Sequence, residues 1–258
     1  MAGKHKVQPV SRVGLDPLVA IAEHLRAGLP GWEDATTTVI RPPAPSDLAQ
    51  DLAYLALHDA DGFLTASIGE DVVGIATAYM RSRQLVLSQL WLLPEAAGEN
   101  LAELLLRRVI AFGERAGVQE FVANVIGSVD LQARLFRLGL RPRFPVYRFT
   151  MPAEQALRVG MELAKLLPAL EITEEAAGGR TGAADLERID RLSRGVSRPT
   201  DHEYWLMQRR LRLAKVREGQ RIAAYAYGGA GQCGPAAGAT SEAALAALGW
   251  ALQFAAEA

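Results

Sequence analysis

The stretch from Ser88 to Gly117 places the strongest constraint on how this chain can fold. An apolar run at 85–93 stops at Pro94, and a short turn of small residues follows at 96–100. An amphipathic segment comes next, with leucine, valine and phenylalanine side chains at helical spacing on one face. The order strand, tight turn, helix directs the N–H groups of a helix N-terminus at the turn, where they can hold a phosphate. The pattern predicts a βα unit, which is either plain packing or the site of a pyrophosphate-bearing cofactor.

Two β-hairpins give the chain an internal symmetry. Each pairs two short alternating strands around a polar, glycine-containing turn, Gly69-Glu70-Asp71 in the first and Glu218-Gly219-Gln220 in the second. The predicted hairpin strands are 63–68 with 72–79 and 213–217 with 221–227. A helical pattern comes after each hairpin at a similar place. The two halves are therefore predicted to be a repeat, and the alternative is a coincidence between two common hairpins.

The two halves differ beyond that helix. The first continues with a strand, a helix and a closing strand at 121–126, 129–138 and 145–151, whereas the second stops at Ala258. Either these elements are missing from the second half, or the strand and helix at 6–29 supply them, because they have the same order. In the simpler arrangement 6–29 opens the first domain. The predicted boundaries are 1–151 for the first domain, 152–168 for a helical linker and 169–258 for a partial second domain.

Composition excludes several classes of function. Half of the residues are hydrophobic, 22% are charged and the net charge is −1, which suits a globular protein with no nucleic-acid or anionic-membrane partner. The single cysteine, Cys233, allows no intramolecular disulfide, and the scattered histidines show no zinc-ligand spacing, so no metal is predicted. The N-terminus lacks the apolar core of a signal peptide and no apolar run is long enough to span a bilayer. These features predict a cytoplasmic protein.

The first half has two helices, a hairpin, a strand, the sequence Leu-Pro-Glu at 93–95, a glycine-containing turn and an amphipathic helix, in this order. This order resembles the GNAT N-acyltransferase superfamily. The segment LQARLFRLGLRP at 131–142 is similar to the late helix of that family. The segments RGVSRPTDHEYWL at 194–206 and GPAAGATSEAALAALGWAL at 234–252 resemble parts of the partner domain in tandem GNAT proteins. The resemblance implies a mixed α/β fold with two tandem GNAT-like domains, the second lacking its last elements.

The resemblance also implies a mechanism. Acetyl-CoA would lie where two parallel strands splay apart, with its pantetheine arm against the backbone near Leu92 and Leu93. An amine of a small molecule would attack the thioester directly, a base would take the amine proton and a tyrosine would protonate the departing thiolate. The backbone N–H groups of the turn and the first helical residues would hold the pyrophosphate: Gly98, Glu99, Asn100, Leu101 and Ala102.

Four positions depart from the family pattern. In the turn motif Gln/Arg-x-x-Gly-x-Gly/Ala, Ala97 replaces the leading polar residue and Asn100 replaces the central glycine, although asparagine tolerates left-handed backbone. Glu99 stands where a basic residue is common and would repel a pyrophosphate. The late-helix tyrosine of the family falls at Leu135, which cannot donate a proton.

Two other residues are candidates for the acid and the base of the reaction. Tyr147 could act as the acid if it points into the cleft, and otherwise it is a half-buried strand aromatic. His202 could act as a base or bind substrate, and otherwise it is a surface residue in the first turn of a helix. Tyr225 and Tyr227 share one face of their strand and line either a second cleft or a core.

The sequence thus predicts an acetyl-CoA-dependent N-acetyltransferase acting on a small-molecule amine. The alternative is a catalytically degenerate GNAT-like module that binds a ligand or another protein, as the altered turn and the missing tyrosine would suggest. The sequence leaves open whether the protein forms a homodimer, because the alanine-rich helix at 241–256 could pack within the chain or across a dimer.

Overall fold

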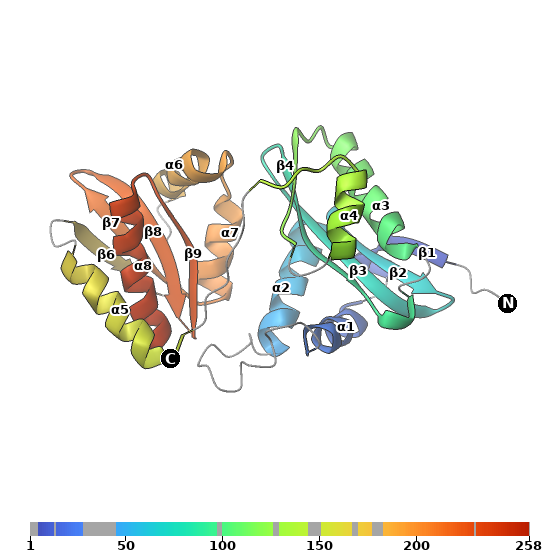
Figure 1. The fold of residues 1–258 in the computed structure, drawn as a ribbon, viewed down its shortest axis with the longest axis horizontal. Coiled ribbons are helices and arrows are strands. Elements are labelled where there is room, and N and C mark those ends of the chain that lie inside the picture. The colour runs from blue at the N-terminus through green and yellow to red at the C-terminus, as the bar shows by residue number, and fades with distance from the viewer. Residues whose placement is uncertain are drawn as a thin grey trace. The chain divides into compact units, whose positions relative to one another are not determined.

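The computed structural model describes residues 5–12, 14–27, 45–96, 100–125, 129–143, 151–166, 170–176, 183–229 and 231–257. They divide into two compact units, each with its own sheet (Figure 1). The described residues up to 143 belong to the first unit and those from 151 to the second. The predicted mixed α/β fold class is confirmed.

The first unit is a mixed sheet with the strand order β1-β2-β3-β4-β5. Its elements are β1 (His5–Pro9), α1 (Asp16–Ala27), α2 (Pro45–His58), β2 (Phe63–Ile68), β3 (Asp71–Arg81), β4 (Gln84–Leu92), α3 (Leu101–Arg115), β5 (Glu120–Ala123) and α4 (Val129–Arg137). Neighbouring strands are antiparallel except β4 and β5, which run parallel and are joined by α3. The predicted hairpin and the βα unit after it are both present.

The N-terminal strand belongs to the first sheet. β1 pairs antiparallel with β2, from His5 opposite Ile68 to Pro9 opposite Leu64. The hypothesis that this strand completes the second half is therefore wrong. The strand is also shorter than the predicted 6–13, because a 3-10 turn begins at Val10. The predicted strand at 145–151 lies outside the described residues except for Met151, which is not in a strand.

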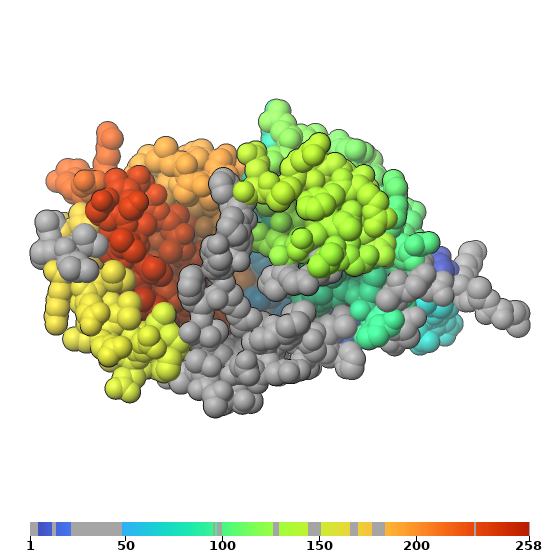
Figure 2. Space-filling view, viewed as in Figure 1, coloured from blue at the N-terminus to red at the C-terminus, as the bar shows by residue number. Residues whose placement is uncertain are grey.

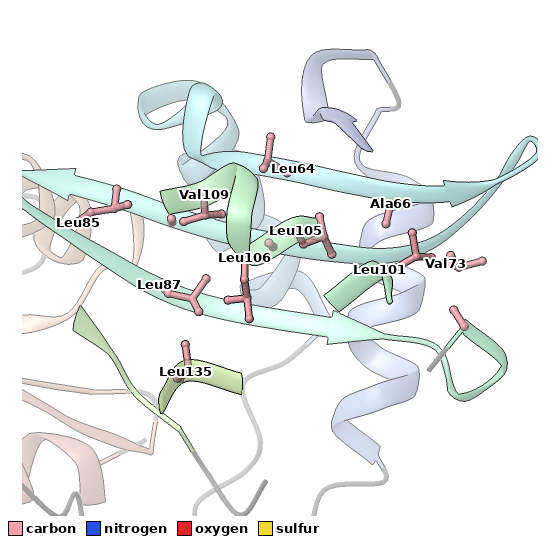
Figure 3. Packing of buried hydrophobic residues seen from close by; sticks show 13 residues of the cluster. Leu64, Ala66, Val73, Leu85, Leu87, Leu101, Leu105, Leu106, Val109 and Leu135 are labelled. Atoms are coloured by element: carbon pink, nitrogen blue, oxygen red, sulfur yellow. The ribbon is translucent and has the colours of Figure 1, made fainter. Parts of the chain in front are cut away.

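The amphipathic face of α3 forms the core of the first unit (Figure 3). Leu101, Leu105 and Val109 are almost fully buried against the apolar face of the sheet, which includes Leu64 and Leu85. Each buried leucine or valine stabilises the fold by roughly 1.5–3 kcal/mol relative to an exposed one. This packing fixes the end of α3 that faces the preceding turn.

The second unit is an antiparallel sheet with the order β6-β7-β8-β9. Its elements are α5 (Ala153–Leu166), β6 (Glu171–Glu175), α6 (Ala183–Arg194), α7 (Pro199–Glu203) with a π-helical turn at Tyr204–Gln208, β7 (Arg212–Glu218), β8 (Arg221–Gly229), β9 (Gln232–Gly238) and α8 (Ser241–Ala256). From β6 onward this order, strand, two helices, three strands, helix, is the same as that from β1 to α3. The hairpins also carry a register shift at the same step, after Ala66 in β2 and after Val216 in β7.

Helix α5 packs on α8 within the second unit (Figure 1). The contact needs glycine on both helices: a Cβ on Gly160 would collide with the carbonyl oxygen of Gly249, and one on Gly249 would lie 2.9 Å from the Cβ of Leu163. The segment predicted as a linker at 152–168 thus contains a helix with its own packing partner.

Candidate active site

Strands β4 and β5 separate halfway along β4. Their parallel pairing runs from Gln84 opposite Glu120 to Leu87 opposite Ala123, and β4 then continues to Leu92 with only β3 as a described partner. The register between β3 and β4 shifts at the same point, which leaves Ser88 as a bulge. A bulge bends its strand and increases its twist, so it helps to open this edge. The exposed backbone edge of β4 can pair with an extended ligand that carries amide groups.

The open edge leads directly to the N-terminus of α3. Leu93 donates its N–H to the carbonyl oxygen of Val73 at 2.8 Å, which holds the strand end against β3. Asn100 then adopts the left-handed conformation (φ 56°) and its side chain makes no capping hydrogen bond. The first N–H groups of a helix have no intrahelical acceptor, so at α3 they are not satisfied by the cap residue and can take an anionic ligand.

The described part of the predicted cofactor site is therefore assembled in one place. Leu92 ends β4 and Leu93 follows it, and both side chains pack on the core of the first unit. Leu101 is buried (1% exposed), so only its backbone can reach a ligand, and Ala102 is half-buried beside it. Gly98 and Glu99 lie outside the described residues, as does the predicted catalytic Tyr147.

A small apolar hollow of about 20 Å³ lies between β4, β5, α3 and α4. Its walls include Leu87, Leu106, Phe121 and Leu135. Leu135 is 5% exposed and stands where the family has its tyrosine. At this position the chain supplies packing and no proton donor.

His202 lies at the centre of a buried polar cluster in the second unit. Its Nε2 is 2.9 Å from Asp190 Oδ2 and its Nδ1 is 3.0 Å from the hydroxyl of Tyr227. Because the Asp190 carboxylate only accepts, Nε2 donates to it. The side chain has no exposed surface, so the alternative that His202 is a surface residue is wrong.

The Asp190 carboxylate is the shared acceptor of this cluster. It receives hydrogen bonds from Arg198 Nε at 3.0 Å, from Arg198 Nη2 at 3.3 Å and from the Tyr225 hydroxyl. Burial by itself would raise the pKa of Asp190, but the hydrogen bonds from His202 and Arg198 outweigh it and hold that pKa at about 2. The cluster is thus a buried ion pair with each partner hydrogen-bonded.

Sequence reasoning singled out His202, Tyr225 and Tyr227 but missed Asp190 and Arg198. A signal for Asp190 was present, since it follows Leu186 and Ile189 on the buried face of α6. Burial raises the pKa of both tyrosines well above the ordinary value, which keeps them neutral donors. These tyrosines form a core and not a second cleft.

The second unit reaches its last helix without a turn. Ala239 donates to the carbonyl oxygen of Ala223 at 2.7 Å, which is the counterpart of the Leu93–Val73 bond. One residue, Thr240, then separates this bond from α8 and caps the helix, its Oγ1 accepting a first-turn N–H at 3.2 Å. One first-turn N–H of α8 is thus satisfied by the side chain of its own cap residue. Within the described ranges, an open strand edge followed by an uncapped helix occurs at β4 and α3.

Two kinds of feature are absent from the described residues. No group of three or more histidine, cysteine, aspartate or glutamate side chains is placed there to hold a metal ion. None of the helices described is long and apolar enough to cross a membrane.

Comparison with known proteins supports a family for the first unit. A family model described as "Acetyltransferase (GNAT) family" matches residues 27–140, which is less than half of the chain. No curated protein matches the sequence.

Solved structures align with the chain at low sequence identity, and the first of them shares its fold. A candidate acetyltransferase from Pyrococcus horikoshii aligns with 97% of this chain and 77% of its own, with 13% identity and a TM-score of 0.65. The aminoglycoside N-acetyltransferase AAC(6')-Iy, solved in complex with CoA, aligns with 58% of this chain and 97% of its own, with 16% identity and a TM-score of 0.44. The aminoglycoside antibiotic 6'-N-acetyltransferase AAC(6')-IG from Acinetobacter haemolyticus aligns with 56% and 96%, with 14% identity and a TM-score of 0.41.

Proposed function

We propose that this protein is an acetyl-CoA-dependent N-acetyltransferase that acts on the amine of a small molecule. The observation that carries the proposal is the parting of β4 from β5 after Leu87, at the edge that leads to the N-terminus of α3. Both elements lie in the segment that matches the GNAT acetyltransferase family model.

The chain's own residues fit the two ends of the cofactor arm. The free edge of β4, up to Leu92 and Leu93, offers backbone groups to the amides of pantetheine. Asn100 and the first residues of α3, Leu101 and Ala102, offer N–H groups to the pyrophosphate, and we assign Gly98 and Glu99 to the same site. A helix N-terminus adds a favourable partial positive charge for these phosphates.

The proposed reaction is a direct transfer. The neutral amine attacks the thioester carbonyl, the new C–N bond forms, the C–S bond breaks, and the amine proton passes to solvent through a base. The departing thiolate takes a proton from an acid, and we assign that role to Tyr147. The protein contributes chiefly by positioning the two reactants, with general acid help on the order of 100-fold or more.

His202 is proposed as a positioning residue instead of a base. Both of its ring nitrogens are engaged inside the core, with Asp190 on one side and Tyr227 on the other. Its proposed role is to hold α6 and α7 against β8.

A second candidate function is a GNAT-like module that binds a ligand without catalysis. It is favoured by one observation, the buried Leu135 at the position of the family's proton donor. The two functions share the cofactor site and differ in turnover.

Isothermal titration with acetyl-CoA, followed by an assay of thiol release with a panel of small amines, separates them. We expect one site per chain, because α8 is capped by Thr240, and amine-dependent release of free CoA. Gly98→Trp should abolish binding, whereas Glu70→Trp, in the exposed hairpin turn of the same unit, should not. Binding without turnover would favour the second function, and no binding by the folded wild type would overturn both.

A further inference from the structure

A polar hollow of about 110 Å³ lies between α3 and α4 in the first unit. It is lined by Glu103 and Arg107 of α3, by Arg134 and Arg137 of α4, and by Leu138. Figure 2 shows α4, in yellow-green, at the surface of this unit. The hollow begins on the first turn of α3, so it adjoins the helix N-terminus proposed to hold the pyrophosphate. At 1.5 Å per residue, Arg107 lies about 9 Å along the helix from Leu101.

The arginines of the hollow are held in place but keep donors for a ligand. Arg107 Nη2 is 2.7 Å from Glu103 Oε1, and Arg134 Nε is 2.8 Å from Asp130 Oδ2. Arg137 uses its Nε for the carbonyl oxygen of Ala133 at 3.3 Å. The Nη groups of Arg134 and Arg137 make no hydrogen bond to any described residue. Arg134 is only 18% exposed, so part of its desolvation has already occurred on folding.

The hollow carries an excess of positive charge. Three guanidinium groups line it and one carboxylate, Glu103, opposes them; counting the more exposed Asp130 still leaves a positive excess. The hydrogen bond from Arg107 and the charges of Arg107, Arg137 and Arg134 all lower the pKa of Glu103. All three positive charges therefore act at the same place, where they can bind a dianion.

We propose that Arg107, Arg134 and Arg137 bind a phosphate monoester, the 3′-phosphate of CoA, and so select CoA over dephospho-CoA. The inference rests on the proposed function. The chemistry matches in three respects: a phosphate monoester carries up to two negative charges at neutral pH, arginine forks bind phosphate oxygens bidentately, and CoA carries this group on the ribose next to its pyrophosphate. These arginines would also supply the basic charge that Ala97 and Glu99 do not give to the turn.

Substitution of Glu103 should change the affinity for CoA in the direction opposite to substitution of the arginines. Its carboxylate engages Arg107 and would face the bound phosphate. Glu103→Gln should therefore strengthen binding of CoA while leaving dephospho-CoA less affected. A purely structural role of the Glu103–Arg107 pair would not produce that difference.

The test is isothermal titration of the full chain with CoA and with dephospho-CoA at one fixed salt concentration. We expect CoA to bind at least about tenfold more tightly, since hydrogen bonds to charged groups are worth on the order of a tenfold change or more. The double variant Arg134→Gln, Arg137→Gln, which keeps the aliphatic stems, should lose this ratio and retain its affinity for dephospho-CoA. Arg115→Ala, on the last turn of α3 and outside the hollow, should leave the ratio unchanged.

The possible outcomes distinguish a failure of the phosphate site from a failure of the proposed function. Equal affinities of the wild type for CoA and dephospho-CoA would overturn the phosphate site and leave the proposed function standing. Binding of neither ligand would overturn both. Inorganic phosphate serves as the probe for a different source of the same anion: tight phosphate binding that does not compete with CoA would also overturn the assignment to the 3′-phosphate.

Discussion

Leu87 and Ala123 form the last backbone pair between β4 and β5. Beyond them β4 continues through the bulge at Ser88 to Leu92, paired with β3 but with no described partner on its other edge. The Leu93–Val73 hydrogen bond holds the end of β4 against β3. The opening is thus built into the sheet itself. The second unit has the equivalent hydrogen bond, from Ala239 to Ala223, but only Thr240 separates this bond from α8.

Removal of the Asp190 charge should destabilise the second unit severely. Asp190→Asn leaves the Arg198 guanidinium, 7% exposed, without its counter-charge, and breaking a buried pair in this way costs about 3–5 kcal/mol. The free energy of unfolding from urea denaturation measures the loss. The matched control is Asp185→Asn on the same helix, whose partner Arg188 is 3.9 Å away and exposed, with an expected change below about 1 kcal/mol. Equal effects at both positions would contradict the buried-pair assignment.

The Asp190 carboxylate should also make the stability of the protein sensitive to acid. The pKa of Asp190 is about 2 in the folded protein against an ordinary value of 3.8, so the unfolded state binds this proton more readily. The stabilisation is therefore complete above about pH 4 and is lost as the pH falls from there toward 2, by roughly 2 kcal/mol in total. Unfolding free energies measured between pH 5 and pH 2 should fall more steeply in the wild type than in Asp190→Asn. Parallel curves would show that another group is responsible.

Gly160→Ala should destabilise the packing of α5 on α8. The new Cβ would meet the backbone of Gly249, which cannot rotate away, so overpacking of about 1–3 kcal/mol should exceed the gain in helix propensity. Glu162→Ala, two residues along the helix and exposed, should change the stability by no more than about 0.5 kcal/mol. If α5 were only a linker, Gly160→Ala would stabilise the protein instead.

Tyr147→Phe tests the proposed acid. We expect kcat to fall by about 100-fold or more while the affinity for acetyl-CoA stays unchanged, because the hydroxyl would act only on the departing thiolate. Steady-state kinetics and titration of the same preparation give the two quantities. Unchanged kcat would remove Tyr147 from the mechanism.

The sequence predicted the elements that depend on local pattern. Strand 63–68, the polar turn at Gly69 and the amphipathic helix from Leu101 all carry a clear period or a turn signal, and the structure has them at nearly the predicted bounds. The parallel pairing of β4 with β5 cannot be predicted from the pattern of either strand alone. It requires that α3 carry the chain back along the sheet between the two strands.

The burial of His202 could not be predicted from its own segment, for a physical reason. His202 stands in the polar segment Pro199–Glu203, which has the composition of an exposed first turn. Its burial depends on Asp190 from α6 and on Tyr227 from β8, residues that are brought together only by the tertiary fold. A polar side chain can be buried at little cost only when such partners are present, and a local pattern does not reveal them.

The central claim is that the N-terminus of α3 holds the pyrophosphate of acetyl-CoA, and a matched pair of variants at Ala102 tests it most directly. An aspartate on the first turn of a helix favours the helix by about 0.3–1 kcal/mol, so Ala102→Asp should fold as well as the wild type, yet its charge would repel the phosphates. Ala102→Asn has the same shape without the charge. We predict that titration with acetyl-CoA shows at least about a tenfold loss of affinity in Ala102→Asp and a nearly unchanged affinity in Ala102→Asn. Wild-type affinity in the folded Ala102→Asp variant would contradict the account.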